Sequence, residues 1–246
     1  MPAAVIQKNL NAPKTVSVRN EGATAAALIY QYSVASANAL WAAYDLARNS
    51  RGKPRGITTD QEQDLLRAML VAAASGLDGA LKQLIRDALS DLIKKHAAVH
   101  DAFEKFTQKR LQIGGVDGVT GVSPKVLSRI LASPNPRARL IEDYIFDLTG
   151  DSLQSPDQLF KVCNALGANK ASIGDQATLK TLFIARNQII HELDMNLGSP
   201  NRKRRVRGQQ NMKSYSERLL KICSDIIGDV DGRLGGIRRR SRLVTS

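Results

Sequence analysis

The sequence predicts an all-α protein, a helical bundle with basic segments at its ends. Hydrophobic residues make up 43% of the 246 residues and aromatic residues only 4%, and the abundance of Ala and Leu favours helices over strands. Apolar residues recur at three- and four-residue steps over long stretches, which is the period of an amphipathic helix. Alternating runs of Val, Ile and Thr, which are typical of strands, are scarce.

The first half of the chain predicts two long helices. The first is Ala-rich, spans residues 22–49, and has larger apolar residues that we expect on its core side: Leu28, Ile29, Tyr32, Leu40, Trp41, Tyr44 and Leu46. Thr59 and Glu62 have the spacing of a capping box, in which each side chain accepts a hydrogen bond from the other residue's backbone N–H. The second helix begins there and continues an apolar stripe to Ile93.

The second half predicts shorter helices, joined to the first half by a Gly-rich loop at residues 112–125. Residues 1–20 lack periodicity, so we expect a flexible basic arm there. One helical domain then covers residues 21–228, and an Arg-rich tail covers residues 229–246. The expected later helices lie at residues 124–131, 137–148, 155–166, 175–195 and 214–227.

The net charge of +13 is concentrated in three segments. Residues 202–207 and residues 233–246 each contribute +5, and the first twenty residues contribute +3, so the rest of the chain is neutral. Dense positive charge suits a polyanion such as nucleic acid, because each phosphate contact releases counterions. The alternative is that these segments are solvated and bind anions only weakly. The candidate RNA-binding residues are Arg202, Lys203, Arg204, Arg205 and Arg207.

Cysteine usage and hydropathy predict a cytoplasmic protein. Cys163 and Cys223 are the only cysteines, and the N-terminus has no long apolar core of the kind that a secretory signal requires. No apolar run reaches the length of about 18 residues needed to span a membrane. We therefore expect reduced thiols and no membrane partner.

The histidines are too few for a typical metal site. His96 and His100 are four residues apart, a spacing that can hold a metal ion. No Glu stands next to His96, so the zinc-protease pattern is absent, and we interpret the two residues as a surface pair. The Gly-rich loop lacks the Gly-Lys-Ser/Thr ending of a phosphate-binding loop. We expect no metal ion and no cofactor.

One predicted helix, residues 175–195, carries polar residues with chemical uses inside an apolar pattern. Asn187 and His191 are four residues apart and so lie on one side of the helix, one turn apart. Arg186 lies about 140° round the helix from His191, but its side chain is long enough to reach the same cleft. A guanidinium, an amide and an imidazole together suit a phosphate group. The alternative interpretation is a surface histidine and an ordinary solvated arginine.

The run Arg186-Asn187-Gln188-Ile189-Ile190-His191 resembles the signature of the HEPN superfamily, in which Arg is followed by a polar residue, usually Asn, and by His after four to six intervening residues; here there are four. With its flanking residues it looks most like the RiboL-PSP-type branch, and the resemblance covers about residues 22–228. It implies a HEPN-type helical bundle in which residues 112–174 are an insertion of short helices. It also implies that Asp78, at the place of an acidic residue on an earlier helix, orients Arg186 or His191. The alternative for Asp78 is a structural role beside Gly76 and Gly79.

The resemblance further implies metal-independent cleavage of RNA. The sugar 2′-OH attacks the phosphorus and leaves a 2′,3′-cyclic phosphate and a 5′-OH. His191 would move the proton, Arg186 would neutralise developing charge, and Asn187 would hold the phosphate or the imidazole. The family builds its site at a dimer interface, so we expect a homodimer with a composite active site. Some family toxins carry a Tyr two residues after the His, where a partner enzyme modifies them; this sequence has Leu193.

Three functions therefore remain open from the sequence. The first is an endoribonuclease with a toxin or phage-defence role and a neutralising partner protein. The second is a non-catalytic module that binds RNA or a nucleotide. The third is a helical interaction protein whose basic tails bind DNA non-specifically.

Overall fold

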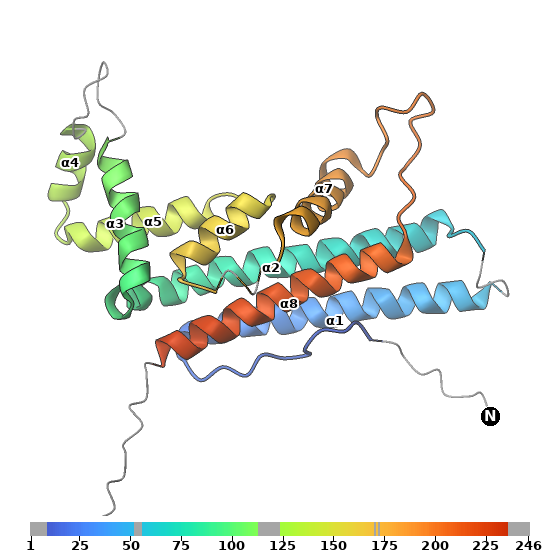
Figure 1. Cartoon of the computed structure of the whole chain (residues 1–246), viewed down its shortest axis with the longest axis horizontal. Helices are drawn as coiled ribbons and strands as arrows, with labels where there is room; N and C mark the ends of the chain where they lie inside the picture. The colour runs from blue at the N-terminus through green and yellow to red at the C-terminus, as the bar shows by residue number, and fades with distance from the viewer. Residues whose placement is uncertain (1–8, 52–55, 113–123, 170, 172, 236–246) are drawn as a thin grey trace, which may run out of the picture.

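The chain is all-α in the computed structural model, which describes residues 9–51, 56–112, 124–169, 171 and 173–235 (Figure 1). These residues contain eight α-helices and no strand beyond one isolated bridge between Met195 and Arg204. The predicted fold class is therefore confirmed. In chain order the helices are α1 (Glu21–Ser50), α2 (Asp60–Lys95), α3 (Ala97–Gln112), α4 (Pro124–Leu131), α5 (Pro136–Thr149), α6 (Pro156–Ala165), α7 (Gln176–Glu192) and α8 (Gln209–Leu234).

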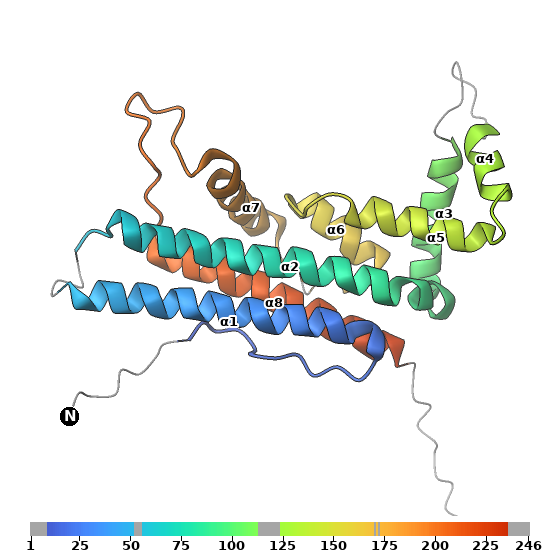
Figure 2. The ribbon, with the colours of Figure 1, turned by 180° about the vertical axis from the view of Figure 1, so that it is seen from behind.

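Three long helices, α1, α2 and α8, lie side by side and form the body of the molecule (Figures 1 and 2). α2 packs against both others and buries side chains along its length, from Leu66 to Ile93. Among the described helices it alone has the length and apolar composition to cross a membrane, but more than half of that window is buried in the bundle. Burial of this kind is expected for the central helix of a bundle, whose apolar side packs against its neighbours.

The capping box predicted at the start of α2 is confirmed. Thr59 Oγ1 accepts a hydrogen bond from Glu62 N at 3.2 Å, and Glu62 Oε2 accepts one from Thr59 N at 3.0 Å. The same carboxylate forms ion pairs with Arg48 at 3.3 Å and Arg51 at 2.8 Å, both at the end of α1. Glu62 therefore starts α2 and joins it to α1.

The helix expected at residues 22–49 is present as α1, but its core side differs from the prediction. Leu28, Tyr32 and Leu46 are 51%, 67% and 65% exposed. Trp41 and Tyr44 are buried as expected, and the rest of the buried side consists of four alanines with Tyr30, Ser33 and Val34. Alanine side chains occupy little volume, so this side lets α1 lie close to α2.

α1 and α2 approach closely at Ser33 and Gly76. Ser33 Oγ donates a hydrogen bond to the Ala72 carbonyl oxygen at 3.1 Å. A Cβ atom placed on Gly76 would lie 1.9 Å from Ser33 Oγ, whereas one on Gly79 would lie 3.5 Å from its nearest neighbour, a methyl group of Ile29. The helix contact therefore requires glycine at position 76 and leaves room at position 79.

Helices α3 to α6 form a smaller group that packs on α2 (Figures 1 and 2). The helices expected at residues 124–131, 137–148 and 155–166 are present as α4, α5 and α6. The sequence did not predict that α3 is separate from α2. His96 is extended (φ −130°, ψ 118°) and its ring Nε2 hydrogen-bonds with the Arg233 carbonyl oxygen at 2.9 Å, so α2 ends at Lys95.

The two ends of the helical domain also differ from expectation. Residues 9–20, expected in a flexible arm, lie against the bundle: Leu10 is buried, and Tyr30 Oη donates a hydrogen bond to the Pro13 carbonyl oxygen at 2.5 Å. Helix α8 runs to Leu234, beyond the expected boundary at residue 228. Asp231 Oδ1 accepts hydrogen bonds from the backbone N–H groups of Arg19 and Asn20 at 3.0 and 2.9 Å. Most of the predicted Gly-rich loop and the arginines after residue 235 lie outside the described residues.

The two glycines of α2 give a matched test of the helix contact. We expect Gly76→Ala to destabilise the protein by about 1–3 kcal/mol, because the new methyl group must displace Ser33. Gly79→Ala should be neutral or stabilising by about 0.5–1 kcal/mol, because alanine costs less backbone entropy in a helix. Urea denaturation of both variants measures the difference. Equal effects of the two substitutions would show that the Ser33 contact does not limit the approach of the helices.

Candidate functional site

α7 carries Arg186, Asn187 and His191, as the sequence predicted. Asp175 precedes it and accepts a hydrogen bond from Thr178 N at 2.8 Å, which satisfies a backbone donor that the first turn leaves unpaired. One side of α7 is buried, and the helix packs against α2 and α6. Ile184 and His191 are seven residues apart on the exposed side.

Arg186 is a buried arginine with few partners. Its side chain is 9% exposed, and its Nη1 donates a hydrogen bond to Asn187 Oδ1 at 2.9 Å. The Nε atom is sealed from solvent and has no hydrogen-bond partner among the described residues. Burial lowers the pKa of Arg186 below its ordinary value, and the nearby Asp78 carboxylate opposes that shift. A guanidinium has five N–H donors, so the described residues use only a small part of the hydrogen-bonding capacity of Arg186.

Asp78 is connected to the motif through the backbone segment that precedes α6. Its Oδ1 accepts a hydrogen bond from Leu153 N at 2.9 Å, and its Oδ2 pairs with Lys82 Nζ at 3.0 Å. The carbonyl oxygen of the next residue, Gln154, accepts a hydrogen bond from Asn187 Nδ2 at 2.9 Å. Leu153 and Gln154 therefore connect Asp78 of α2 to the side-chain amide of Asn187. Within the described part of the chain, Asp78 makes no direct hydrogen bond with Arg186 or His191.

His191 lies apart from these contacts. Its side chain is exposed, and it makes no hydrogen bond or ion pair with any residue that the structure describes. Arg186 is buried and His191 faces solvent, which agrees with the angle of about 140° between them on the helix. A single chain thus presents an imidazole on its surface and a guanidinium behind it.

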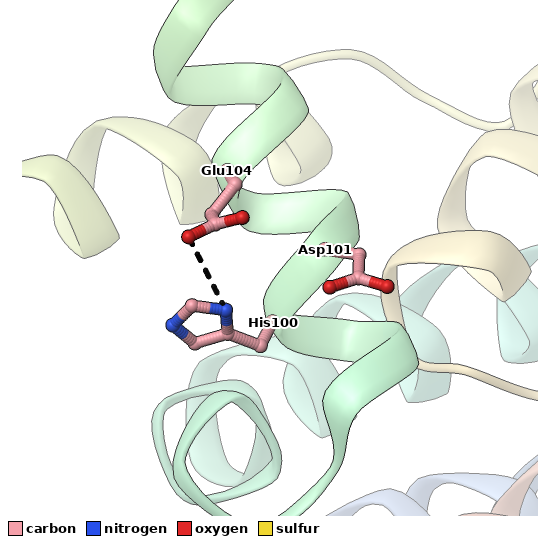
Figure 3. A group of neighbouring side chains, drawn as sticks. All are labelled: His100, Asp101 and Glu104. Atoms are coloured by element: carbon pink, nitrogen blue, oxygen red, sulfur yellow. Dashed lines mark ion pairs between the residues drawn. The ribbon is translucent and has the colours of Figure 1, made fainter.

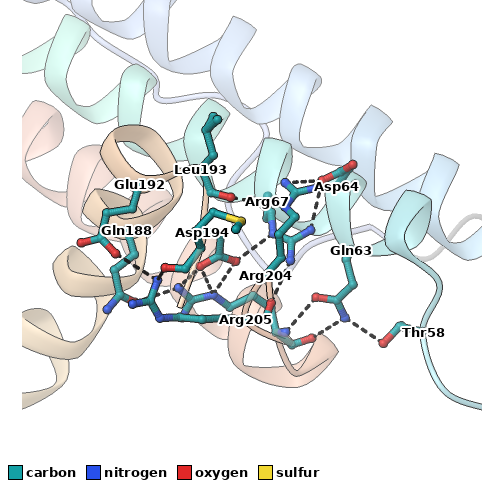
Figure 4. Close-up of polar contacts among 12 residues, drawn as sticks. Thr58, Gln63, Asp64, Arg67, Gln188, Glu192, Leu193, Asp194, Arg204 and Arg205 are labelled. Carbon is teal, nitrogen blue, oxygen red and sulfur yellow. Dashed lines mark hydrogen bonds and ion pairs between the residues drawn. The ribbon is translucent and has the colours of Figure 1, made fainter. Parts of the chain in front are cut away.

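The end of α7 is fixed by a buried carboxylate, Asp194 (Figure 4). Its side chain is 0% exposed and accepts a hydrogen bond from Arg67 Nε of α2 at 2.8 Å. Arg207 contributes a second guanidinium, whose Nε lies 3.0 Å from Asp194 Oδ2 and whose Nη2 also bonds Asp194 Oδ1. We call Arg67, Asp194 and Arg207 the carboxylate clamp. It joins α2, the end of α7 and the segment before α8.

The backbone at the clamp turns sharply. Leu193 and Asp194 both have left-handed conformations, with φ of 50° and 60°, which are uncommon for residues other than glycine. Asp194 N donates a hydrogen bond to the Gln188 carbonyl oxygen at 2.8 Å, which closes the end of α7. Burial opposes ionisation of Asp194, but hydrogen bonds from Arg207 and Arg67 outweigh it and hold the pKa of the carboxyl below its usual value. The charged clamp therefore stabilises this turn, three residues after His191.

The basic run at residues 202–207 divides into two parts. Arg204 pairs with Asp64 at 2.7 Å, Arg205 pairs with Glu192 at 3.0 Å, and Arg207 belongs to the clamp. Arg202 and Lys203 are exposed and have no hydrogen-bond or ion-pair partner for their side chains among the described residues. Two of the five candidate RNA-binding residues therefore present free charge, while three hold the segment against α2 and α7.

Several residues that fix the site have no clear signal in the sequence. Asp194 follows the motif helix, and Arg67 stands within the apolar stripe of α2, where a charged residue on a buried side indicates a partner. The partner itself is distant in the sequence. The role of Gln154 depends on a backbone carbonyl and leaves no trace in residue type.

A second polar cluster lies on α3, away from the motif. His100 Nδ1 lies 3.6 Å from Glu104 Oε1, and potential ligand atoms of His100, Asp101 and Glu104 all lie within 4.8 Å of one another. Figure 3 shows the imidazole and the Glu104 carboxylate facing each other across one helical turn. The cluster stands on one solvent-facing helix surface, and we assign no metal to it. The pair considered from the sequence is split between two contacts: His96 Nε2 bonds the Arg233 carbonyl oxygen, and His100 faces Glu104.

Comparison with known proteins gives one result. The family model described as RiboL-PSP-HEPN matches residues 38–228. The matched region contains Asp78, Arg186, Asn187 and His191, and it extends across the short helices α3 to α6. No curated protein and no solved structure matches the chain.

Removal of the Asp194 charge tests the carboxylate clamp. We expect Asp194→Asn to destabilise the protein by about 3–5 kcal/mol at neutral pH, because the buried guanidinium of Arg67 and the part-buried one of Arg207 lose their shared buried counter-charge. The carboxyl pKa is depressed in the folded protein, so its stabilisation is present above the unfolded pKa of about 3.9 and is lost as the pH falls through the folded value. The difference between wild type and variant should therefore narrow below about pH 4.

Asp225→Asn is the control, because Asp225 forms an exposed ion pair with Lys221 on α8. An exposed pair contributes less than about 1 kcal/mol. Denaturant midpoints measured across pH compare the two variants. If Asp194→Asn cost no more than Asp225→Asn at neutral pH, the clamp would not hold the end of α7.

Proposed function

The chain belongs to the RiboL-PSP-HEPN family, and from this premise we propose that it is a metal-independent endoribonuclease. The family suggests a nuclease or RNA-related function. The observation that supports cleavage at this motif is the state of Arg186: it is buried, and among the described residues its Nε has no partner and its guanidinium makes one hydrogen bond, to Asn187. Buried polar groups normally have hydrogen-bond partners, so a buried guanidinium with unpaired donors is suited to bind an anion. A phosphate group is such an anion and matches a guanidinium geometrically.

The proposed reaction is transesterification within the RNA strand. The 2′-OH loses its proton and attacks the adjacent phosphorus, the bond to the 5′-oxygen breaks, and the leaving oxygen takes up a proton. The products are a 2′,3′-cyclic phosphate and a 5′-OH. His191 transfers a proton, and Arg186 stabilises the charge that develops on the phosphoryl oxygens. Asn187 holds the guanidinium of Arg186, and Asp78 is a positioning residue that acts through Leu153 and Gln154.

A homodimer with a composite active site completes this proposal. The reaction needs both a base and an acid, and one chain offers a single motif histidine. His191 is exposed on the same side of α7 as Ile184, which is 47% exposed. Association of two such surfaces about a two-fold axis brings two imidazoles to one interface. Arg202 and Lys203 follow α7 closely and are placed to attract the RNA backbone.

We place this activity in the cytoplasm, in a toxin or phage-defence role with a neutralising partner protein. The free, buried state of Cys163 and Cys223 suits a reducing compartment. Leu193 stands two residues after His191, so modification of a tyrosine at that position is not the means of control.

The second candidate function is a non-catalytic module that binds RNA or a nucleotide. It is favoured by the contacts of Asn187, whose Oδ1 and Nδ2 are both occupied by protein groups. In this case Arg186 binds a phosphate, and His191 takes no part in chemistry.

Cleavage of labelled RNA and matched DNA in EDTA distinguishes the two functions. We expect wild-type protein to cut RNA only, leaving cyclic-phosphate ends, and His191→Ala to lower the rate by about 10²- to 10⁴-fold. His100→Ala is the matched control, because it removes a partly exposed histidine from α3 and should leave the rate unchanged. RNA that is bound but uncut by wild type would favour the binding module. Cleavage that survives His191→Ala, or that requires a metal ion, would contradict the proposed mechanism.

Mixed dimers test the composite site. Wild-type and His191→Ala chains are unfolded together in equal amounts, refolded and assayed. If each active site needs both imidazoles, only dimers with two wild-type chains are active, and the activity falls to about a quarter of that of the same total amount of wild type. Independent sites on each chain would instead retain about half. The second result would contradict a shared active site and leave the RNA-cleaving function in place.

A further inference from the structure

A pocket of about 340 Å³ lies between α3, α5 and α6 and contains no residue of α7. Its lining combines basic and aromatic side chains, including Lys105, Phe106, Lys109, Arg110 and Tyr144. The volume is within the range of about 300–1,000 Å³ that is usual for sites that bind small molecules.

The basic side chains of the pocket are largely unpaired. Lys161 forms an ion pair with Asp147 at 2.7 Å. Lys105, Lys109 and Arg110 have no ion pair or side-chain hydrogen bond with any described residue, and the Nε atom of Arg110 is sealed from solvent without a partner. The pocket thus has an excess of positive charge and an unsatisfied guanidinium, which together favour an anionic ligand.

Aromatic side chains form another part of the pocket lining. Phe106 and Tyr144 stack with ring centroids 4.6 Å apart, and Phe103 packs against Tyr144 from the core with centroids 5.8 Å apart. Tyr144 is nearly buried, and its hydroxyl has no hydrogen-bond partner among the described residues. The exposed side chain of Asn164 also lines the pocket and offers both a donor and an acceptor. Rings beside an amide suit a flat heterocycle with polar edges.

We propose that this pocket binds a nucleotide unit. Arg110, Lys105 and Lys109 hold the phosphate, while the base lies against Phe106 and Tyr144 and hydrogen-bonds with Asn164. The nucleotide is either a free mononucleotide or one residue of an RNA chain, since both present the same phosphate and base. The site is separate from α7, so its occupancy does not depend on the catalytic proposal.

Isothermal titration calorimetry tests the pocket with four probes: AMP, UMP, adenosine and inorganic phosphate. We expect both mononucleotides to bind more tightly than adenosine or phosphate, because only they engage the charged and the aromatic parts together. Stacking tolerates different bases, so AMP and UMP should bind with similar affinity. Loss of one charged donor in Arg110→Ala should weaken AMP by about tenfold or more.

Three further variants keep the test decisive. Phe106→Leu should weaken AMP and leave phosphate binding unchanged, which a general loss of folding would not do. Arg86→Ala removes an exposed arginine from α2 and should bind AMP as wild type does. His191→Ala should also bind AMP normally, which separates this pocket from the proposed active site. Circular dichroism checks that each variant is folded.

Competition identifies the source of the nucleotide. Displacement of a fluorescent AMP derivative by a short RNA oligonucleotide would indicate a residue of an RNA chain, and failure of RNA to displace it would indicate a free mononucleotide. Absence of binding by AMP, UMP and RNA would overturn the proposal. So would phosphate binding as tight as AMP binding, or AMP binding that is unchanged in both Arg110→Ala and Phe106→Leu.

Discussion

The buried carboxylate of Asp194 is the contact on which the geometry of the candidate site depends. A charge without solvent access is costly unless it is paired, and the pairing here comes from guanidiniums of two different segments, Arg67 in α2 and Arg207 before α8. Movement of any of the three segments would leave buried charge unpaired. The end of α7 is consequently held to the longest helix of the bundle. His191 lies three residues before this contact, and its backbone is held there although its side chain has no partner in the described part of the chain.

The helices were predictable because the signals that specify them are local. The three- to four-residue period, the Thr59–Glu62 capping box and the short helices α4 to α6 all depend on residues close together in the chain, and all are present. The buried side of α1 was only partly predictable from hydrophobicity, because alanines share it with Trp41 and Tyr44 while Leu28 and Tyr32 are exposed. Which side of α1 is buried depends on how closely α1 and α2 approach, and the sequence of α1 does not specify the surface of α2.

In the candidate site, too, the features set by neighbouring residues were predictable and those set by distant residues were not. The spacing of Asn187 and His191 placed them correctly on α7, because both belong to one helix. Neither the burial of Arg186 nor the connection from Asp78 through Leu153 and Gln154 to Asn187 follows from spacing, since these residues are far apart in the chain. The charge of the basic run indicated a surface for a polyanion. Which of its arginines remain free depends on acidic residues elsewhere, such as Asp64, that only the folded chain brings near.

The position of α8 in the chain has a consequence for synthesis. α8 is the last described helix, yet it packs along both α1 and α2 and contributes buried residues as far as Leu234. A nascent chain that has not reached this helix leaves the apolar sides of α1 and α2 uncovered, and long-range contacts of this kind form late in folding. The bundle therefore closes only after α8 has been synthesised as far as Leu234. Chains that stop before α8 would lack the finished core and would be substrates for proteolysis.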